Sequence, residues 1–263
     1  MKLAVNYSAP LIRLLNEGLV KIDLIKCPDW DGMLQEARPY GPITIHFDLE
    51  VGLGHTLRVD LDRIARLKEE TKTPHVNTHL VTPKTFNPDH QEDIRNVNNL
   101  WRDELHFMID KFGGKSVALE HYPFTCNNPH IAYAADSRVF SNVIRDTGCQ
   151  LLLDLAHARI TADTLGLDVR TYIQSLPLEK LVEIHITGTR PHGGVLTDHF
   201  ELDEQDWELL NWALQEIRIG AWPKPDIIAF EYGGVGSAFA WRNKYKHLKT
   251  QVPKLYELVH QLD

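Results

Sequence analysis

The sequence predicts an α/β fold, a (β/α)8 or TIM barrel, formed by a single domain over residues 1–263. Eight short apolar or β-branched runs recur along the chain, and amphipathic segments lie between them. Strands that alternate with helices form parallel sheets through crossover connections. Eight such units in about 250 residues match a TIM barrel. We find no linker, low-complexity tract or short repeat that would divide the chain.

The eight candidate strands follow one another at intervals that leave room for a helix. They comprise residues 2–7, 19–26, 42–47, 75–80, 116–121, 149–155, 181–186 and 226–232. Helical patterns cover residues 61–71, 93–112, 137–148 and 203–218. Asp60 and Asp203 stand at N-cap positions, and Gly113 and Gly148 stand where helices end.

A doubly wound open sheet is the alternative fold. It usually has fewer strands and a Gly-rich phosphate-binding turn after the first one. This chain has the sequence NYSAP at that point. The barrel is therefore the better prediction.

Composition excludes several classes of protein. The chain is 43% hydrophobic and 24% charged, which is typical of a globular protein. Its formal net charge of −8 argues against nucleic acid as a partner, since binding to phosphates needs a basic surface. No run approaches the roughly 18 apolar residues of a membrane span. The N-terminal stretch is too interrupted for a signal peptide, and the three widely spaced cysteines suit reduced thiols, so we expect a cytoplasmic protein.

Polar side chains gather at the ends of the predicted strands, where TIM barrels carry their chemistry. From the third strand onward, each strand ends in, or is followed by, a side chain that can bind metal. One His or Glu at a strand end is usually a hydrogen-bonded rim residue, but repetition at equivalent positions indicates a shared role. The candidate ligands are His46, His79, Glu120, Asp154, His157, His185, Asp198, His199 and Glu231.

This donor set exceeds what one metal ion needs. A single zinc or iron ion takes about four to six donors, so nine would leave buried carboxylates facing one another. Two or three ions bridged by carboxylates such as Glu120 or Glu231 would use the surplus. Imidazole and carboxylate donors suit iron, zinc and manganese, and the sequence does not choose among them.

Some features have competing interpretations. Asp154 and His157 can both turn into the barrel mouth, or they can be a helix-capping Asp and a surface His. The Gly-rich run EYGGVGS at residues 231–237 lies where barrels often bind phosphate but lacks a longer fingerprint. Further candidates near strand ends, for orienting ligands or contacting substrate, are Asn6, Lys26, Arg159 and Arg190.

Three runs carry a resemblance to a known family: LLLDLAHARITA, YIQSLPLEKLVEIHITG and GVLTDHFELDEQDWELL. They resemble the multinuclear non-haem iron-dependent oxidases, formerly a family of unknown function, which include peptide-modifying enzymes of the methanobactin and thiaglutamate pathways. The resemblance implies a barrel with two or three irons held by the nine residues above. It also implies a peptide cysteine as substrate, delivered by a separate protein.

The chain departs from this family in the loop after the seventh strand. The family usually has Asp-x-His there, whereas Asp198 and His199 are adjacent, and Thr189 stands where the family often has His. His192 is therefore an alternative to His199 as the loop ligand.

The order of ligands is also similar to the trinuclear zinc endonuclease IV family and, more loosely, to xylose-isomerase-like sugar isomerases. We expect a metal-dependent oxidoreductase, an iron oxidase or oxygenase acting on a peptide or small molecule. The alternative is a divalent-metal-dependent sugar or sugar-phosphate isomerase or epimerase, or a phosphoester hydrolase. A barrel that only stores metal ions is the non-catalytic possibility.

Overall fold

The computed structural model describes residues 1–234 and 242–261. Its main sheet has nine strands in the order β3-β2-β1-β11-β8-β7-β6-β5-β4, and neighbouring strands are parallel. The strands are β1 (Lys2–Asn6), β2 (Leu24–Pro28), β3 (Ile43–His46), β4 (Glu50–Val51), β5 (Val76–Leu80), β6 (Val117–His121), β7 (Gln150–Asp154), β8 (Leu181–Ile186) and β11 (Ile227–Phe230).

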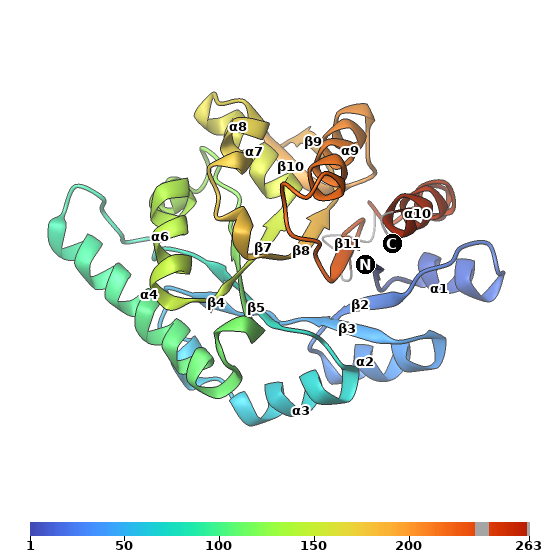
Figure 1. Ribbon diagram of the computed structural model, residues 1–263, viewed down its shortest axis with the longest axis horizontal. Helices are drawn as coiled ribbons and strands as arrows, with labels where there is room; N and C mark the ends of the chain where they lie inside the picture. The colour runs from blue at the N-terminus through green and yellow to red at the C-terminus, as the bar shows by residue number, and fades with distance from the viewer. Residues whose placement is uncertain (235–241, 262–263) are drawn as a thin grey trace.

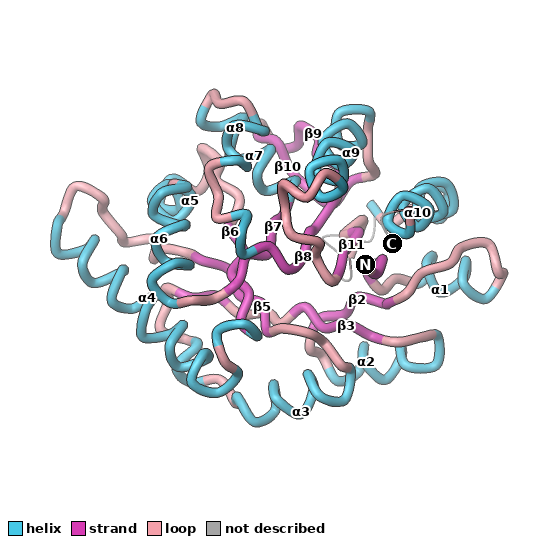
Figure 2. Tube along the Cα trace, viewed as in Figure 1, coloured by secondary structure: helices cyan, strands magenta, loops and turns pink. Residues whose placement is uncertain are grey.

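The sheet curls into a TIM barrel, as the sequence predicts. β3 and β4 stand at opposite ends of the strand order, yet only Phe47, Asp48 and Leu49 separate them in the chain. The third predicted strand therefore continues into β4 and brings the two ends of the sheet together. Figure 1 shows the helices arranged around the outside of the curled sheet, and Figure 2 shows the strands gathered at the centre.

The helices cover the sheet with apolar faces. In α4, Trp101, Leu105 and Met108 are fully buried at the three- and four-residue spacing of one helix face. No helix within residues 1–234 and 242–261 combines the length and apolarity that a bilayer crossing needs. The helices are α1 (Ala9–Asn16), α2 (Asp31–Ala37), α3 (Leu61–Thr71), α4 (Gln91–Phe112), α5 (Ala132–Ala135), α6 (Ser137–Thr147), α7 (Leu155–Leu165), α8 (Val169–Gln174), α9 (Glu204–Arg218) and α10 (Tyr245–His260).

The second strand differs from the sequence prediction. Strand pairing begins at Leu24, opposite Ala4, and not at residue 19. In this register, residues 19–21 would lie opposite positions that precede Lys2, where β1 begins. They therefore have no strand to pair with. Tertiary pairing thus shortens the apolar run and moves the strand towards Pro28.

The segment after β8 is a hairpin, where the sequence analysis expected a loop. β9 (Gly188–His192) pairs antiparallel with β10 (Val195–Phe200). Gly193 and Gly194 form the turn with φ of 62° and 84°, a conformation that glycine adopts without strain. This hairpin lies next to the barrel and carries two of the candidate ligands.

Candidate metal centre

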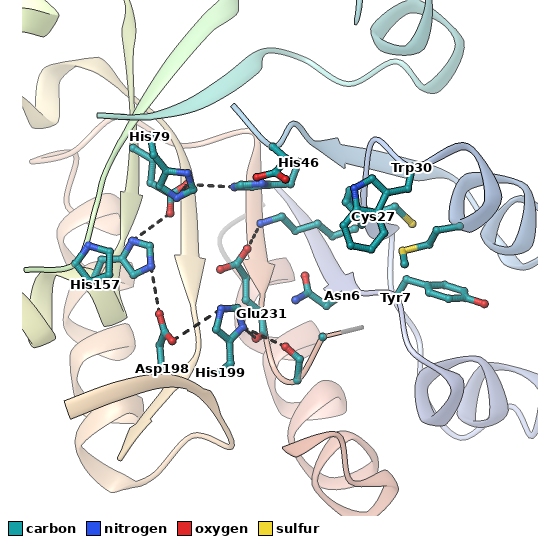
Figure 3. Close-up of a pocket in the computed structure, with 18 of the residues that line it drawn as sticks. Asn6, Tyr7, Cys27, Trp30, His46, His79, His157, Asp198, His199 and Glu231 are labelled. Carbon is teal, nitrogen blue, oxygen red and sulfur yellow. Dashed lines mark hydrogen bonds and ion pairs between the residues drawn. The ribbon is translucent and has the colours of Figure 1, made fainter. Parts of the chain in front are cut away.

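A pocket of about 590 Å³ lies at the carboxyl ends of the barrel strands. Most of the predicted site residues line it, and Figure 3 shows histidines and carboxylates from different strands, a helix and a loop pointing toward one another. Asp154 and His185 lie beneath it and are fully buried. The predicted residues that line the pocket are Asn6, Lys26, His46, His79, Glu120, His157, Asp198, His199 and Glu231.

Strand register brings these side chains to one level. His79 of β5 lies opposite Glu120 of β6, and Asp154 of β7 lies opposite His185 of β8. Because side chains of a strand alternate between its two faces, residues in matching register point the same way. The parallel barrel thus brings residues that are far apart in the sequence into one cluster.

Glu120 lies at the centre of the cluster. Its Oε2 atom is 3.2 Å from Nε2 of His46 and 3.2 Å from Nε2 of His79. Its Oε1 atom is 3.3 Å from Nδ1 of His157 and 3.4 Å from Nδ1 of His185. Burial would raise the pKa of this carboxyl, but His79 and His185 hold it well below its usual value. Each oxygen of an ionised carboxylate therefore faces its own pair of imidazoles.

Within residues 1–234 and 242–261, three overlapping groups of side chains can hold a metal ion. In each group one donor atom from every member lies within 4.8 Å of the others. The groups are His46 with His79 and Glu120, His46 with His185 and Glu231, and Glu120 with Asp154 and His157.

Asp154 caps a helix with one oxygen and can face a metal ion with the other, so both roles considered from the sequence apply to it. Its Oδ1 atom accepts a hydrogen bond of 2.9 Å from the backbone N–H of His157 and so caps α7. Its Oδ2 atom is buried and accepts no hydrogen bond from any residue described. Such an atom is costly to bury without a partner, and burial raises the pKa of this carboxyl. A cation beside Oδ2 would satisfy it, so the residues fit a bound metal ion.

His157 points into the same region and is buried, so it is not a surface histidine. Its Nδ1 atom lies 3.0 Å from the backbone carbonyl of His121, to which it donates, and this directs Nε2 towards carboxylates. Nε2 is 3.3 Å from Oδ2 of Asp198 and 3.6 Å from Oδ2 of Asp154. A hydrogen bond from one ring nitrogen that orients the other is the usual support of a metal-binding imidazole.

The hairpin places His199, and not His192, in the pocket. Nδ1 of His199 lies 2.8 Å from the carbonyl of Glu231, whereas His192 is exposed at the end of β9 next to the turn. Neighbouring strand residues normally face opposite sides, but β10 has a register shift between Thr197 and Phe200, and His199 has a φ of 61°. This irregularity lets the adjacent Asp198 and His199 both line the pocket.

Two arginines do not lie where the sequence predicted. Arg159, on α7, pairs with Asp206, and Arg190 donates to Asp203 at 3.0 Å and forms an ion pair with Asp206 at 3.4 Å. Asp203 and Asp206 form the capping box of α9. Thr189 also donates to Asp206, at 3.2 Å. These cations thus hold α9 against the hairpin, and neither lines the pocket.

Glu183 is a buried residue that the sequence analysis missed. Its Oε1 atom is 2.9 Å from Nε2 of His185, and its Oε2 atom is 2.7 Å from Nε2 of His75. Burial would raise the pKa of Glu183, but hydrogen bonds from His185 and His75 lower it. It lies two residues before His185 on β8, a spacing that puts both on the same face and could have identified it.

The other side of the pocket is more apolar. Tyr7, Cys27 and Trp30 lie there, away from His79 and His157 (Figure 3), and Met33 also lines the pocket. Burial raises the pKa of Cys27 to about 12, so its sulfur stays a thiol. Cys126 is exposed. The Gly-rich run at 231–237 enters the pocket through Gly233 and Gly234, and residues 235–237 lie outside the described part of the chain.

Comparison with protein families identifies one match over most of the chain. The sequence profile of the family described as RiPP precursor modification enzyme MbnB/TglH/ChrH matches residues 27–223. A UPF0276 protein of Acaryochloris marina is 25% identical over 217 residues, which cover 75% of this chain and 73% of the relative.

Solved structures share the barrel at low sequence identity. A xylose isomerase-like TIM barrel protein from Mycobacterium smegmatis in complex with magnesium has a TM-score of 0.60, is 14% identical and covers 99% of this chain and 97% of its own. The IOLI protein with a bound zinc atom has a TM-score of 0.58, is 16% identical and covers 100% of this chain and 99% of its own. These similarities support the xylose-isomerase-like barrel.

Proposed function

Because the chain belongs to the MbnB/TglH/ChrH family of RiPP precursor modification enzymes, we propose that it is a metal-dependent oxidoreductase that modifies a peptide. The family match includes every candidate ligand except Glu231. A RiPP precursor is a peptide, so the family supports this substrate class over a free small molecule.

The position of Glu120 carries the proposal. Its two carboxylate oxygens face separate pairs of imidazoles at 3.2–3.4 Å. Glu120 belongs to two of the donor groups, one with His46 and His79 and the other with Asp154 and His157, and would help to hold divalent ions that supply the reactive chemistry. The buried Oδ2 atom of Asp154 adds an acceptor that such an ion would satisfy.

Iron is the metal we favour. The imidazole and carboxylate donors suit iron, zinc and manganese, but zinc has no redox chemistry for an oxidation. A bound iron would supply the one-electron chemistry that the side chains lack. The nearby Cys27 is not expected to compete as a ligand, because burial raises the pKa of its thiol to about 12 and metals bind the thiolate.

The chain's own residues would bind and orient the peptide. Tyr7 and Trp30 line the side of the pocket away from His79 and His157, and Met33 also lines the pocket, so an apolar part of the substrate can pack there and exclude water. A pocket of about 590 Å³ accepts a side chain and its neighbours, but not a whole precursor. As the family resemblance implies, we include in the proposal a separate protein that presents the peptide.

Metal analysis and an oxidation assay test this function. Protein purified without oxygen from its native host should contain iron, and it should consume dioxygen when mixed with cysteine-containing peptides from a panel. Glu120→Gln should lose both properties, whereas Glu208→Gln, an exposed residue of α9, should keep them. Protein that carries only zinc or magnesium, or that turns over sugars with added Mn²⁺ and no peptide, would contradict the proposal and favour the isomerase alternative.

A further inference from the structure

Lys26 is a buried cation among the candidate ligands. It lies on β2 and is 3% exposed. Its ammonium nitrogen contacts Oε1 of Glu231 and lies 2.9 Å from Nε2 and 3.5 Å from Nδ1 of His185. A lysine this buried is rare unless it is paired, and here its partners are themselves candidate metal ligands.

The ammonium group lies where a metal ion would otherwise bind. His185 and Glu231, with His46, form one of the three donor groups, whose ligand atoms lie within 4.8 Å of one another. The Lys26 ammonium contacts His185 and Glu231, two of the three members of this group, and so occupies space beside the atoms that an ion held there would need. Both the size of the two cations and their repulsion oppose joint occupancy.

The backbone of β2 holds Lys26 in this place. Lys26 is in register with Asn6 of β1 on one side and Thr44 of β3 on the other. Because both edges of β2 are paired, the strand cannot turn its side chains out of the barrel without losing two ladders of hydrogen bonds. The Lys26 side chain thus enters the pocket from a fixed backbone position.

We propose that Lys26 is a built-in cation that takes the place of a third metal ion, so that this centre binds two ions. This inference rests on the proposed function, since it assumes that the centre binds metal. The two remaining donor groups, His46 with His79 and Glu120 and Glu120 with Asp154 and His157, would hold the ions. They share Glu120, whose two oxygens face different imidazoles.

The pocket carries an excess of negative charge. Its acidic side chains are Asp48, Glu50, Glu120, Asp198 and Glu231, with Asp154 buried beside them, and they oppose the cations Lys26 and Arg242. Bound metal ions would offset this excess, and the Lys26 ammonium already contributes one positive charge beside Glu231.

Metal stoichiometry tests the inference directly. Metal-free protein is titrated with Zn²⁺ and, without oxygen, with Fe²⁺, and the bound metal is measured by mass spectrometry after desalting. Wild type should bind two ions per chain, and Lys26→Met should gain one ion because it lacks the ammonium group. Lys26→Arg, which keeps the charge, and Lys115→Met, which removes an exposed lysine, should both bind two.

The measured stoichiometries distinguish a failure of the role given to Lys26 from a failure of the proposed function. Three ions in wild type, or two in a folded Lys26→Met variant, would overturn the role of Lys26 but leave a metal enzyme. No bound metal in wild type would overturn both. If Lys26→Met fails to fold by circular dichroism, the wild-type and Lys26→Arg stoichiometries still decide, since three ions in either would contradict the inference.

Discussion

Replacing Glu120 by Gln should weaken the binding of both metal ions and not of only one. Gln keeps the size of the side chain but removes the charge that faces His46 and His79 through one oxygen and His157 and His185 through the other. A carboxylate that bridges two ions contributes to the binding of each. The amide of Gln has only one oxygen and therefore cannot replace the bridge.

The expected loss of affinity follows from the burial of Glu120, which is 1% exposed. Water cannot replace the missing charge at such a position, and removal of one partner from a buried charged pair costs about 3–5 kcal/mol. Since about 1.4 kcal/mol corresponds to a tenfold change in affinity, we expect each ion to bind about 100- to 4,000-fold more weakly.

Competition titrations with a chelator of known affinity measure this change for each ion. Glu208→Gln makes the same chemical substitution on the exposed face of α9 and should leave both affinities unchanged. A loss confined to one ion would show that Glu120 is a terminal ligand. Unchanged binding of both ions would refute the assignment of the centre to this carboxylate.

Three further perturbations probe other parts of the site. Asp154→Asn keeps an oxygen that can cap α7 but removes the charge on the buried side. Metal content measured by mass spectrometry should therefore fall, while Tm stays within a few degrees of wild type. A collapse of Tm would contradict the distinction between the metal-facing oxygen and the capping oxygen. His199→Ala should weaken metal binding in a titration and His192→Ala should not, because the hairpin turns only His199 into the pocket; equal effects would argue against that placement. Burial lowers the pKa of His157, but Asp154 and Asp198 raise it well above its ordinary value, so a metal ion must displace a proton from Nε2. Metal affinity should then rise about tenfold per pH unit up to this raised pKa, so the rise should continue past about pH 6.5, where an ordinary histidine would already be neutral; a profile that is flat above about pH 6.5 would contradict the role of His157.

The sequence predicts the barrel well because its strands are short apolar runs separated by helices. It places the second strand too early, since pairing with β1 and not local composition decides where the strand begins. It also misses the β9–β10 hairpin, although Gly193 and Gly194 between two short extended runs are a known hairpin signal. Local patterns thus predict the number of barrel strands better than their bounds.

The sequence predicts which residues reach the candidate site better than it predicts the direction of their side chains. A strand-end position indicates the level of a residue in the barrel, and the register of the strands brings Glu120 and Asp154 to one cluster. It does not indicate the direction of a side chain in a following helix, so Arg159, two positions after His157 on α7, points to Asp206 and not to the pocket. The irregularity of β10 that brings His199 beside Asp198 likewise has no signal in composition.

Anomalous diffraction at the iron edge, from crystals of protein purified without oxygen from its native host, tests the account most directly. It should show two iron peaks, one on each side of the Glu120 carboxylate, and no peak at the Lys26 ammonium group. Zinc alone in the centre, or an absence of metal beside Glu120, would contradict the proposed metal-dependent oxidoreductase.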